Sequence, residues 1–322
     1  MRDEAADELA GEATDELTWR DLAADDVAEV AALTGRCLVA HGGLPLAADE
    51  AFAASRYTGA AVATRGVLDR HGRLVASAAV RPGAVPVPGA VPVPGADGAP
   101  PRAMATGQVD PAYEGRGLGA RLLDWCLRTA AERGAQVTVE TESLTDAAER
   151  LFTSRGLIQV FGEIVMRFDL AGTEPPPVRP PAGVQLVEWS ARHAPRFFKV
   201  YDAAFRERPG FPGWSEQQWV DWVTAEGDLR PEWSLLADAG ADGDVGFVVF
   251  ADCWVVQVGV RPDWRGRAVG AALVAEALRR MRADGATEAF LDVNVDNPAR
   301  LLYPRLGFAV LGRRARFARA SA

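Results

Sequence analysis

The chain of 322 residues is poor in the side chains that form disulfides or bind metal ions. It has three cysteines and three histidines, and no two cysteines or two histidines lie close together in the sequence. A disulfide framework needs an even set of cysteines, and structural zinc sites need closely spaced ligand pairs. The sequence therefore predicts no disulfide framework and no metal site. A reducing, cytoplasmic location is expected.

Clustered positive charge and long apolar runs are also missing. Lys199 is the only lysine, and the formal net charge is −9. Because a protein that binds a nucleic-acid backbone needs clustered cations, no nucleic-acid partner is expected. No apolar run approaches the roughly 18 residues of a membrane span, so no membrane partner is expected either. The first 16 residues are acidic and lack the basic start and apolar stretch of a signal peptide.

The length and composition predict two folded domains. Hydrophobic residues make up 48% of the chain and charged residues 25%, which is typical of a protein with a buried core. We expect an acidic disordered tail at 1–16, an N-terminal domain at 17–172, a proline-rich linker at 173–183 and a C-terminal domain at 184–322. The N-terminal domain carries an insert at 82–101, in which the six residues 82–87 are repeated as 88–93. Its prolines predict an extended loop.

The apolar patterns predict the elements of each domain. Strands are expected at 17–20, 62–64, 74–80, 163–170, 185–189, 235–237 and 245–251. Helices are expected from Asp25 through Leu33 and over 193–205. Ser215 and Gln218 have the spacing of a capping box that begins a further helix.

Residues 107–157 and 258–308 are two copies of one pattern. Moved by 151 positions, the first segment aligns with the second without a gap, and 14 of the 51 positions are identical. Each copy reads as strand, glycine-bearing turn, helix, strand and short helix. The chain is therefore predicted to contain one fold twice.

The turn in each copy has the composition of a phosphate site. A run of backbone N–H groups that opens a helix after a strand attracts anions, and the helix dipole adds to that attraction. Neither turn has the glycine spacing and position of a dinucleotide-binding loop, and neither has a P-loop lysine.

These motifs resemble those of the GNAT superfamily, the GCN5-related N-acetyltransferases. The family pattern is Arg/Gln-x-x-Gly-x-Gly/Ala after a strand ending in Val-x-Pro, and here Arg265, Ala268 and Gly270 follow Val260-Arg261-Pro262. The later segment 297–308 is similar to the second family signature, Asn-x-x-Ala-x-x-Leu-Tyr-x-x-x-Gly-Phe. The resemblance implies an α/β fold class with two tandem GNAT folds, each a mixed, mostly antiparallel central sheet with helices on both faces.

The resemblance also implies a set of site residues and acetyl-CoA as co-substrate. The strand before the turn would pair with the pantetheine arm, the turn would bind the pyrophosphate, and Tyr303 would donate a proton to the leaving thiolate. The expected coenzyme-binding residues of the C-terminal copy are Val258, Val260, Arg265, Gly266, Arg267, Ala268, Val269, Gly270, Ala271 and Asn297. Those of the N-terminal copy are Val109, Arg116, Gly117, Leu118, Gly119 and Ala120.

The two copies differ at positions that matter for this chemistry. Phe152 stands at the position of Tyr303 and cannot donate a proton, and Asp146 matches Asn297. Glu114 occupies the first position of the N-terminal motif, where it would either repel a phosphate or point away. In the C-terminal copy, Ala268 keeps its N–H contact if its φ is negative. The C-terminal copy is therefore expected to be catalytic and the N-terminal copy degenerate.

The function expected from the sequence is transfer of an acetyl group from acetyl-CoA to the primary amine of a small molecule. A protein amine as acceptor, or a non-catalytic acyl-CoA sensor, are the alternatives. The general base stays open between Asp252, Asp292 and a chain of waters. The tryptophans at 214–222 line an acceptor pocket or belong to the core, and the chain is a monomer or a homodimer.

Overall fold

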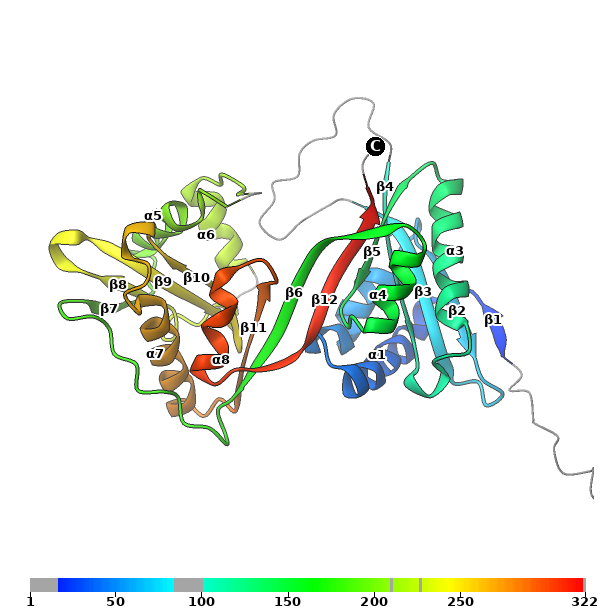
Figure 1. The fold of residues 1–322 in the computed structure, drawn as a ribbon, viewed down its shortest axis with the longest axis horizontal. Coiled ribbons are helices and arrows are strands. Elements are labelled where there is room, and N and C mark those ends of the chain that lie inside the picture. Colours follow the sequence, from blue (N-terminus) through cyan, green and yellow to red (C-terminus); the bar gives the residue numbers. More distant parts are fainter. Residues whose placement is uncertain (1–16, 84–100, 209–210, 226–227, 321–322) are drawn as a thin grey trace, which may run out of the picture. The chain divides into compact units, whose positions relative to one another are not determined.

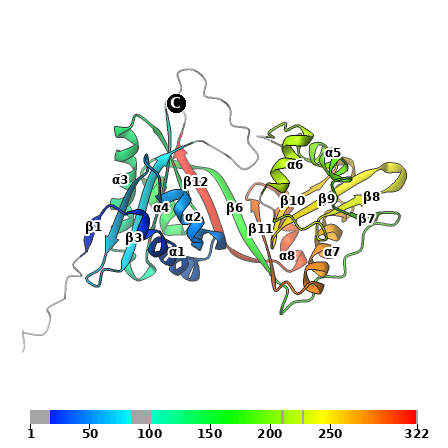
Figure 2. The same cartoon turned by 180° about the vertical axis from the view of Figure 1, so that it is seen from behind.

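The computed structural model describes residues 17–83, 101–208, 211–225 and 228–320. The expected acidic tail and most of the repeat insert, 84–100, lie outside these residues. The described chain forms two compact units, and each has strands covered by helices (Figures 1 and 2). Of the described residues, the first unit holds 17–83, 101–160 and 316–320, and the second holds those from 161 to 315. No helix of the described residues is long and apolar enough to cross a membrane.

The first unit is built on a five-stranded sheet in the order β1-β2-β3-β4-β5, antiparallel except for the parallel pair β4–β5. Its elements are β1 (Thr18–Arg20), α1 (Val27–His41), α2 (Glu50–Tyr57), β2 (Ala63–Leu68), β3 (Leu74–Pro82), β4 (Arg102–Val109), α3 (Leu118–Glu132), β5 (Gln136–Thr141) and α4 (Asp146–Ser154). Strand β3 is buried on both faces from Leu74 to Val80, because helices cover the sheet on both sides.

The second unit repeats this plan, with the strand order β11-β10-β9-β8-β7 and a parallel pair β10–β11. Its elements are β7 (Gln185–Glu188), α5 (Ala194–Phe205), α6 (Glu216–Thr224), β8 (Leu235–Asp238), β9 (Asp244–Ala251), β10 (Trp254–Val260), α7 (Val269–Ala283), β11 (Glu288–Asn294), a short 3-10 helix η6 (Pro298–Leu301) and α8 (Tyr303–Leu306). The fold class is therefore mixed α/β, as predicted.

Two long strands, β6 (Leu157–Asp169) and β12 (Ala309–Arg319), each have residues in both units. The expected strand at 163–170 is present, but its residues from Glu163 to Asp169 pair antiparallel with β11 in the second unit. In the first unit, Phe317 of β12 packs on Phe152 of α4, with ring centroids 5.0 Å apart. Apolar alternation predicts that a segment is a strand, but it does not identify the partner strand.

The sequence missed helix α2, although the other expected elements are confirmed. Asp49 accepts hydrogen bonds from the N–H groups of Ala51 and Phe52 and so caps α2, which is an ordinary helix-start signal. The capping box of Ser215 and Gln218 is present at the start of α6. Trp219 of that helix is fully buried, and its Nε1 donates to Oε1 of Gln257 at 3.0 Å, so this tryptophan belongs to the core.

The two copies do not align without a gap. Thr145 accepts from the N–H of Ala148 and begins α4, whereas Asn297 accepts from the N–H of Ala299 and begins η6. These caps are one residue farther apart than Gly117 and Ala268, the N-cap residues of α3 and α7. In the C-terminal copy, one residue is added before β11 and one is missing from the helical segment after it. The two changes cancel, so an alignment without gaps does not reveal the difference in spacing. Asn297 is therefore matched by Thr145, and its predicted match to Asp146 is wrong.

Candidate active site

Strand β10 separates from β11 almost at its start. Among the described residues, the parallel pairing of β10 with β11 is limited to Trp254 opposite Phe290. In the first unit, β4 stays paired with β5 over five positions, from Arg102 to Thr106. A strand that leaves its neighbour has backbone N–H and C=O groups available for an extended ligand. The splayed strand that the family resemblance implies is therefore present, and it is longer in the C-terminal copy.

A β-bulge accompanies the separation in the C-terminal copy. The register of β10 against β9 shifts between Val255 and Gln257, which leaves Val256 as the extra residue. The equivalent pair, β3 with β4, keeps one register from Ala76 to Pro82. Bulges turn the backbone locally and are frequent beside active sites. The two copies therefore differ in backbone geometry at the strand where a thioester would lie.

The two turns have the same backbone conformation. Gly115 and Gly117 have φ of 75° and 78° in the N-terminal copy, and Gly266 and Ala268 have φ of 77° and 62° in the C-terminal copy. The condition of a negative φ at Ala268 is therefore not met. The turn requires a left-handed residue before the helix, and alanine adopts that conformation at a cost of about 1–2 kcal/mol.

The turn of the C-terminal copy has free donors. The N–H groups from Gly266 to Ala271 have no acceptor among the described residues, as expected for the start of a helix. Arg267 is exposed, and its guanidinium carbon lies 4.7 Å from the ring centroid of Trp264. Arg116 lies 4.7 Å from the ring centroid of Tyr113 in the N-terminal copy. Each turn therefore presents one arginine that an aromatic ring orients.

The first motif residue of each turn contacts the protein instead. Arg265 donates from Nη2 to the carbonyl of Ala204 at 2.9 Å and from Nε to the carbonyl of Val260 at 3.3 Å. Glu114 lies with Oε1 2.7 Å from Nε2 of His41. The carboxylate of Glu114 is therefore engaged at the end of α1. Of the two arginines proposed for phosphate, only Arg267 is free of such contacts among the described residues.

Small residues bring each helix start against the splayed strand. A Cβ added at Gly270 would lie 3.4 Å from Cγ2 of Val260 and 3.9 Å from Cγ1 of Val258. In the N-terminal copy, a Cβ at Gly119 would lie 3.8 Å from Cγ2 of Val109. The predicted strand and turn residues of each copy are therefore neighbours. Val269 and Leu118 are buried under their helices, and Ala120 and Ala271 are half-buried in the first turn.

Tyr303 lies at the start of α8 and is buried, with 7% of its surface exposed. Its ring packs edge-on against Phe308, with centroids 5.9 Å apart. Burial raises the pKa of Tyr303 to about 12, while nearby Arg208 lowers it and Asp292 raises it further. Its hydroxyl has no hydrogen-bond partner in the described part of the chain, which is unusual for a buried tyrosine. The phenol is therefore neutral and has a free proton to donate.

The candidate bases fall in different places. Asp252 lies in the turn between β9 and β10 with φ of 45°, and its N–H donates to the carbonyl of Asp228. It precedes β10, whereas the phosphate turn follows that strand. Asp292 of β11 lies 3.1 Å from Nη1 of Arg314 and close enough to Tyr303 to affect its pKa. Asp292 is therefore the carboxylate that the fold brings toward Tyr303.

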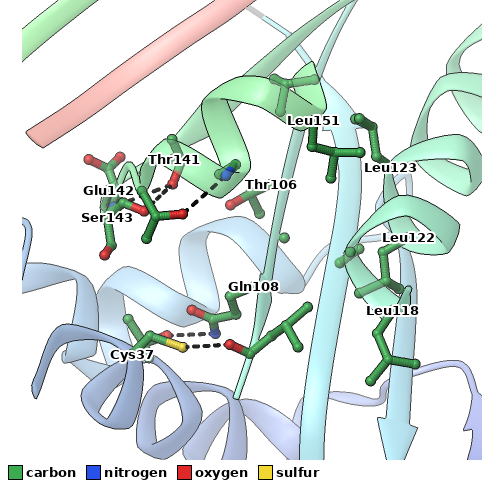
Figure 3. A pocket seen from close by; sticks show the side chains of 18 of the residues that line it. Cys37, Thr106, Gln108, Leu118, Leu122, Leu123, Thr141, Glu142, Ser143 and Leu151 are labelled. Carbon is green, nitrogen blue, oxygen red and sulfur yellow. Dashed lines mark hydrogen bonds between the residues drawn. The ribbon is translucent and has the colours of Figure 1, made fainter. Parts of the chain in front are cut away.

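The N-terminal copy contains a cavity of about 400 Å³ around its own turn and strand. The cavity is lined by residues of α1, α2, β4, α3, β5 and α4, and by the turn residues Gly115, Gly117, Gly119 and Ala120. Figure 3 shows Leu118, Leu122 and Leu123 along one wall and Cys37 and Gln108 along the other. The copy predicted to be degenerate thus keeps a binding space.

Sequence reasoning missed two groups of residues near these sites. Arg208, which follows α5, affects the pKa of Tyr303, and no motif marks it. Helix α2 supplies Phe52, Arg56 and Tyr57 to the cavity. The cap at Asp49 was the available signal for that helix. Within the described ranges, no group of three His, Cys, Asp or Glu side chains has the arrangement of a metal site.

This geometry agrees with what comparison with known proteins finds. The family model of the acetyltransferase (GNAT) family matches residues 59–157 and 189–308. The chain belongs to the GNAT acetyltransferase family and contains two GNAT regions, and the donor of that family is acetyl-CoA.

The most similar relatives include two mycothiol acetyltransferases. The protein of that name from Rhodococcus opacus is 29% identical over 94% of this chain and 98% of its own length. The one from Rhodococcus jostii is 30% identical over 68% of this chain and 75% of its own length. The similarity to the Rhodococcus opacus protein thus extends over nearly the full length of both chains.

Two solved structures share the fold. A GCN5-related N-acetyltransferase from Sphaerobacter thermophilus has a TM-score of 0.69 and 23% identity, with 94% of both chains covered. A tandem GNAT protein from the clavulanic acid biosynthesis pathway has a TM-score of 0.55 and 20% identity, over 94% of this chain and 98% of the other.

Proposed function

We propose that the protein transfers an acetyl group from acetyl-CoA to the primary amine of a small molecule, and that the C-terminal copy, at 184–322, performs the reaction. The observation that carries this assignment is the phenol of Tyr303, a buried residue whose hydroxyl bonds to no described residue, in the copy whose strand β10 leaves β11 and carries a bulge. The N-terminal copy, at 17–172, has Phe152 at the matching place.

The turn and the first turn of α7 hold the pyrophosphate. The amides from Gly266 to Ala271 converge on an anion at the positive end of the helix dipole. Arg267 adds a charge-assisted contact, and its stacking on Trp264 limits the side-chain freedom that is lost on binding. Asn297 fixes the start of η6 and so the position of Tyr303. Arg265 acts as a brace between the turn and α5.

The free edge of β10 positions the thioester. A backbone N–H between Val255 and Val260 stabilises the oxyanion that forms when the amine attacks the carbonyl carbon. The C–S bond then breaks, and the sulfur leaves as a thiolate that needs a proton. Because the edge N–H groups are held by the sheet, they need no reorganisation during the reaction.

The pKa of Tyr303 defines its role. A thiol has a pKa near 8.5, and the pKa of Tyr303 is about 12. Complete proton transfer from the phenol to the thiolate would cost about 5 kcal/mol at 1.36 kcal/mol per unit. Tyr303 therefore donates a hydrogen bond that strengthens as charge forms on the sulfur. Arg208, which lowers its pKa, makes that bond stronger, and the ammonium formed on the acceptor supplies the net proton.

Release of free thiol from acetyl-CoA with a panel of amines tests the function. The relatives are named mycothiol acetyltransferases, so de-acetylated mycothiol heads the panel, followed by other small primary amines and a peptide with a free N-terminus. We expect turnover with a small amine. Turnover with the peptide alone would favour a protein acceptor, and binding of acetyl-CoA without any thiol release would favour a sensor.

Charge reversal at the turn tests the assignment to the C-terminal copy. Arg267→Glu is expected to raise the KM for acetyl-CoA by about tenfold to hundredfold, the range of a contact to a charged group. Arg279→Glu makes the same change on the exposed face of the same helix, far from the turn. Equal KM values for the two variants would remove Arg267 from the site.

A further inference from the structure

We propose that the N-terminal copy binds a coenzyme A thioester with an acyl chain longer than acetyl, and that the chain lies in the cavity beneath α3. This proposal rests on the proposed use of the GNAT turn for phosphate, here in the N-terminal copy. It adds the kind of acyl group that the site accepts and the absence of turnover there.

The cavity joins the turn to the core in one continuous space of about 400 Å³. Gly115, Gly117 and Gly119 line it at the turn, and Leu122, Leu123 and Cys126 line it along the buried face of α3. A ligand whose phosphates lie at the turn can therefore extend an apolar end toward the core without a change in the backbone.

The space exists because the strands beneath α3 carry very small side chains. Ala78 pairs with Gly107, and Val80 pairs with Ala105. Ala78, Ala105 and Gly107 all line the cavity. At the same places in the C-terminal copy, Val248 pairs with Val258 and Phe250 pairs with Val255.

In the C-terminal copy, Val248, Val255 and Val258 occupy the space that the small residues leave open in the N-terminal copy. Val248 and Val255 are buried in the core with α7, and Val258 packs against that core. On the opposite face of β10, side chains also come closer to the strand in the C-terminal copy. Gly259 allows Phe205 to approach β10, since an added Cβ would lie 2.9 Å from its ring. The C-terminal copy thus has room for a small acyl group, and the N-terminal copy has room for a longer one.

The chemistry of the walls favours a hydrocarbon. The inner end is formed by aliphatic side chains and a thiol. The polar lining lies toward the other wall, where Nε2 of Gln108 donates to Oγ1 of Thr34 at 2.7 Å and Arg56 pairs with Glu142 at 3.4 Å. An apolar cavity gains nothing from water and binds apolar groups. Each methylene moved from water into it tightens binding by about fourfold.

Phe152 makes this a site of binding and not of transfer. It lines the same cavity at the position that Tyr303 has in the other copy. A phenyl ring donates no hydrogen bond to a leaving thiolate, and β4 lacks the bulge of β10, so transfer from the bound thioester is disfavoured in this copy. The N-terminal copy would therefore report on longer acyl thioesters while the C-terminal copy uses acetyl-CoA.

Calorimetric titration of the full chain with acetyl-, butyryl- and hexanoyl-CoA tests the proposal, in an Arg267→Glu background that weakens the second site. Butyryl-CoA has two more methylenes than acetyl-CoA, so we expect it to bind about 16-fold more tightly. The double variant Ala78→Val/Ala105→Val copies the C-terminal residues, and it should lose this dependence on chain length while still binding acetyl-CoA.

Ala103→Val is the matched control, because it makes the same change on β4 at a buried residue outside the cavity lining. It should keep the dependence on chain length, and thermal unfolding checks that each variant is folded. Equal affinity for all three thioesters in the parent chain would overturn the proposal, whatever the variants do. A dependence of affinity on chain length that persists in the Ala78→Val/Ala105→Val variant would also overturn the proposal.

The two proposals fail in different ways. If acetyl transfer to an amine is measured but chain length has no effect on binding, only the acyl inference is lost. If no coenzyme A species binds to either copy, the proposed function is lost as well.

Discussion

Arg116 stacks on Tyr113 in the N-terminal copy, and Arg267 stacks on Trp264 in the C-terminal copy, at the same distance and at matching places in the two turns. The left-handed residues of the two turns also match. What differs lies around the turns: a bulged, separated strand and a phenol in one copy, and a regular strand and a phenyl ring beside a cavity in the other. The comparison teaches that the turn kept its conformation while the strand and the aromatic residue beside it changed.

Opposite charges at equivalent positions are a second contrast. Asp110 in the N-terminal copy matches Arg261, and Glu114 matches Arg265. Oδ2 of Asp110 lies 2.6 Å from Nε of Arg36 and 2.5 Å from Nη2 of Arg73, while Arg261 pairs with Asp263 at 2.5 Å. Burial raises the pKa of Asp110, but hydrogen bonds from the Ala112 N–H, Arg36 and Arg73 hold it below the ordinary value. Each copy therefore satisfies its own charge locally.

The largest effect expected is on stability, at the first of these positions. Asp110→Ala removes the buried carboxylate that the half-buried Arg36 and the exposed Arg73 share, and it should lower the free energy of unfolding by about 1–3 kcal/mol, the cost of losing hydrogen bonds to a charged group. Arg261→Ala removes a pair at the surface and should cost about 1 kcal/mol or less. Urea unfolding of both variants measures the difference. Similar losses would mean that the two charges are equally important to the fold.

The next effect is on the rate. Tyr303→Phe should lower kcat by about a hundredfold, because a hydrogen bond that forms with the leaving sulfur is lost, while the KM for acetyl-CoA changes little. Phe152→Tyr is the reciprocal change, and it should not create a second active copy, since β4 lacks the bulge of β10. Steady-state kinetics of both variants test this. An unchanged kcat in Tyr303→Phe would contradict the role of the phenol.

The alkaline limit of stability involves both copies, because burial also raises the pKa of Tyr57 in the N-terminal copy. Burial raises the pKa of both Tyr201 and Tyr303 to about 12, above the value near 10 of an unfolded tyrosine. A raised acid pKa contributes stability that is complete below pH 10 and is lost as the pH rises toward 12. Each such tyrosine should reduce the unfolding free energy by at most about 1.4 kcal/mol per pH unit in that window.

Tyr303→Phe should weaken the fall of the unfolding free energy with rising pH. The decrease in slope should be at most the contribution of one ionising group, about 1.4 kcal/mol per pH unit. Unfolding measured at intervals from pH 9 to 12 would show it. Parallel curves for the variant and the parent would mean that Tyr303 ionises in the folded state as it does in water.

The smallest effect is in the turns. Ala268→Gly should stabilise the protein by about 0.5–1 kcal/mol, because relief of the left-handed strain exceeds the added entropy of the unfolded chain. Gly117→Ala should destabilise it by a similar amount, since its Cβ would meet no atom within 4 Å and only the backbone is strained. Thermal unfolding of the two variants provides the test. Changes of the same sign would show that the turns are not equivalent.

The repeat, the turns and Tyr303 could be read from the sequence because each depends on local spacing. The residues of the cavity could not. Ala78 and Gly107 line it together because two strands pair in one register, and that register involves residues far apart in the chain. Likewise, Arg208 affects Tyr303 only because the fold brings together two residues that are far apart in the chain. The match of Asn297 to Asp146 failed because an added and a lost residue cancel in a gapless alignment.

The sequence by itself determined that this protein has two GNAT regions, with a glycine-bearing turn in each and a tyrosine at the position of Tyr303 in only one. Glycine positions, helix-start signals and the periodicity of apolar residues depend on a few neighbouring residues, so they can be recognised in the sequence without knowledge of the fold. Only the tertiary structure decided which strand leaves its neighbour, that Ala268 takes a left-handed conformation, and that the first copy has a cavity. Those features depend on side chains that meet across strands and helices, where packing decides the outcome.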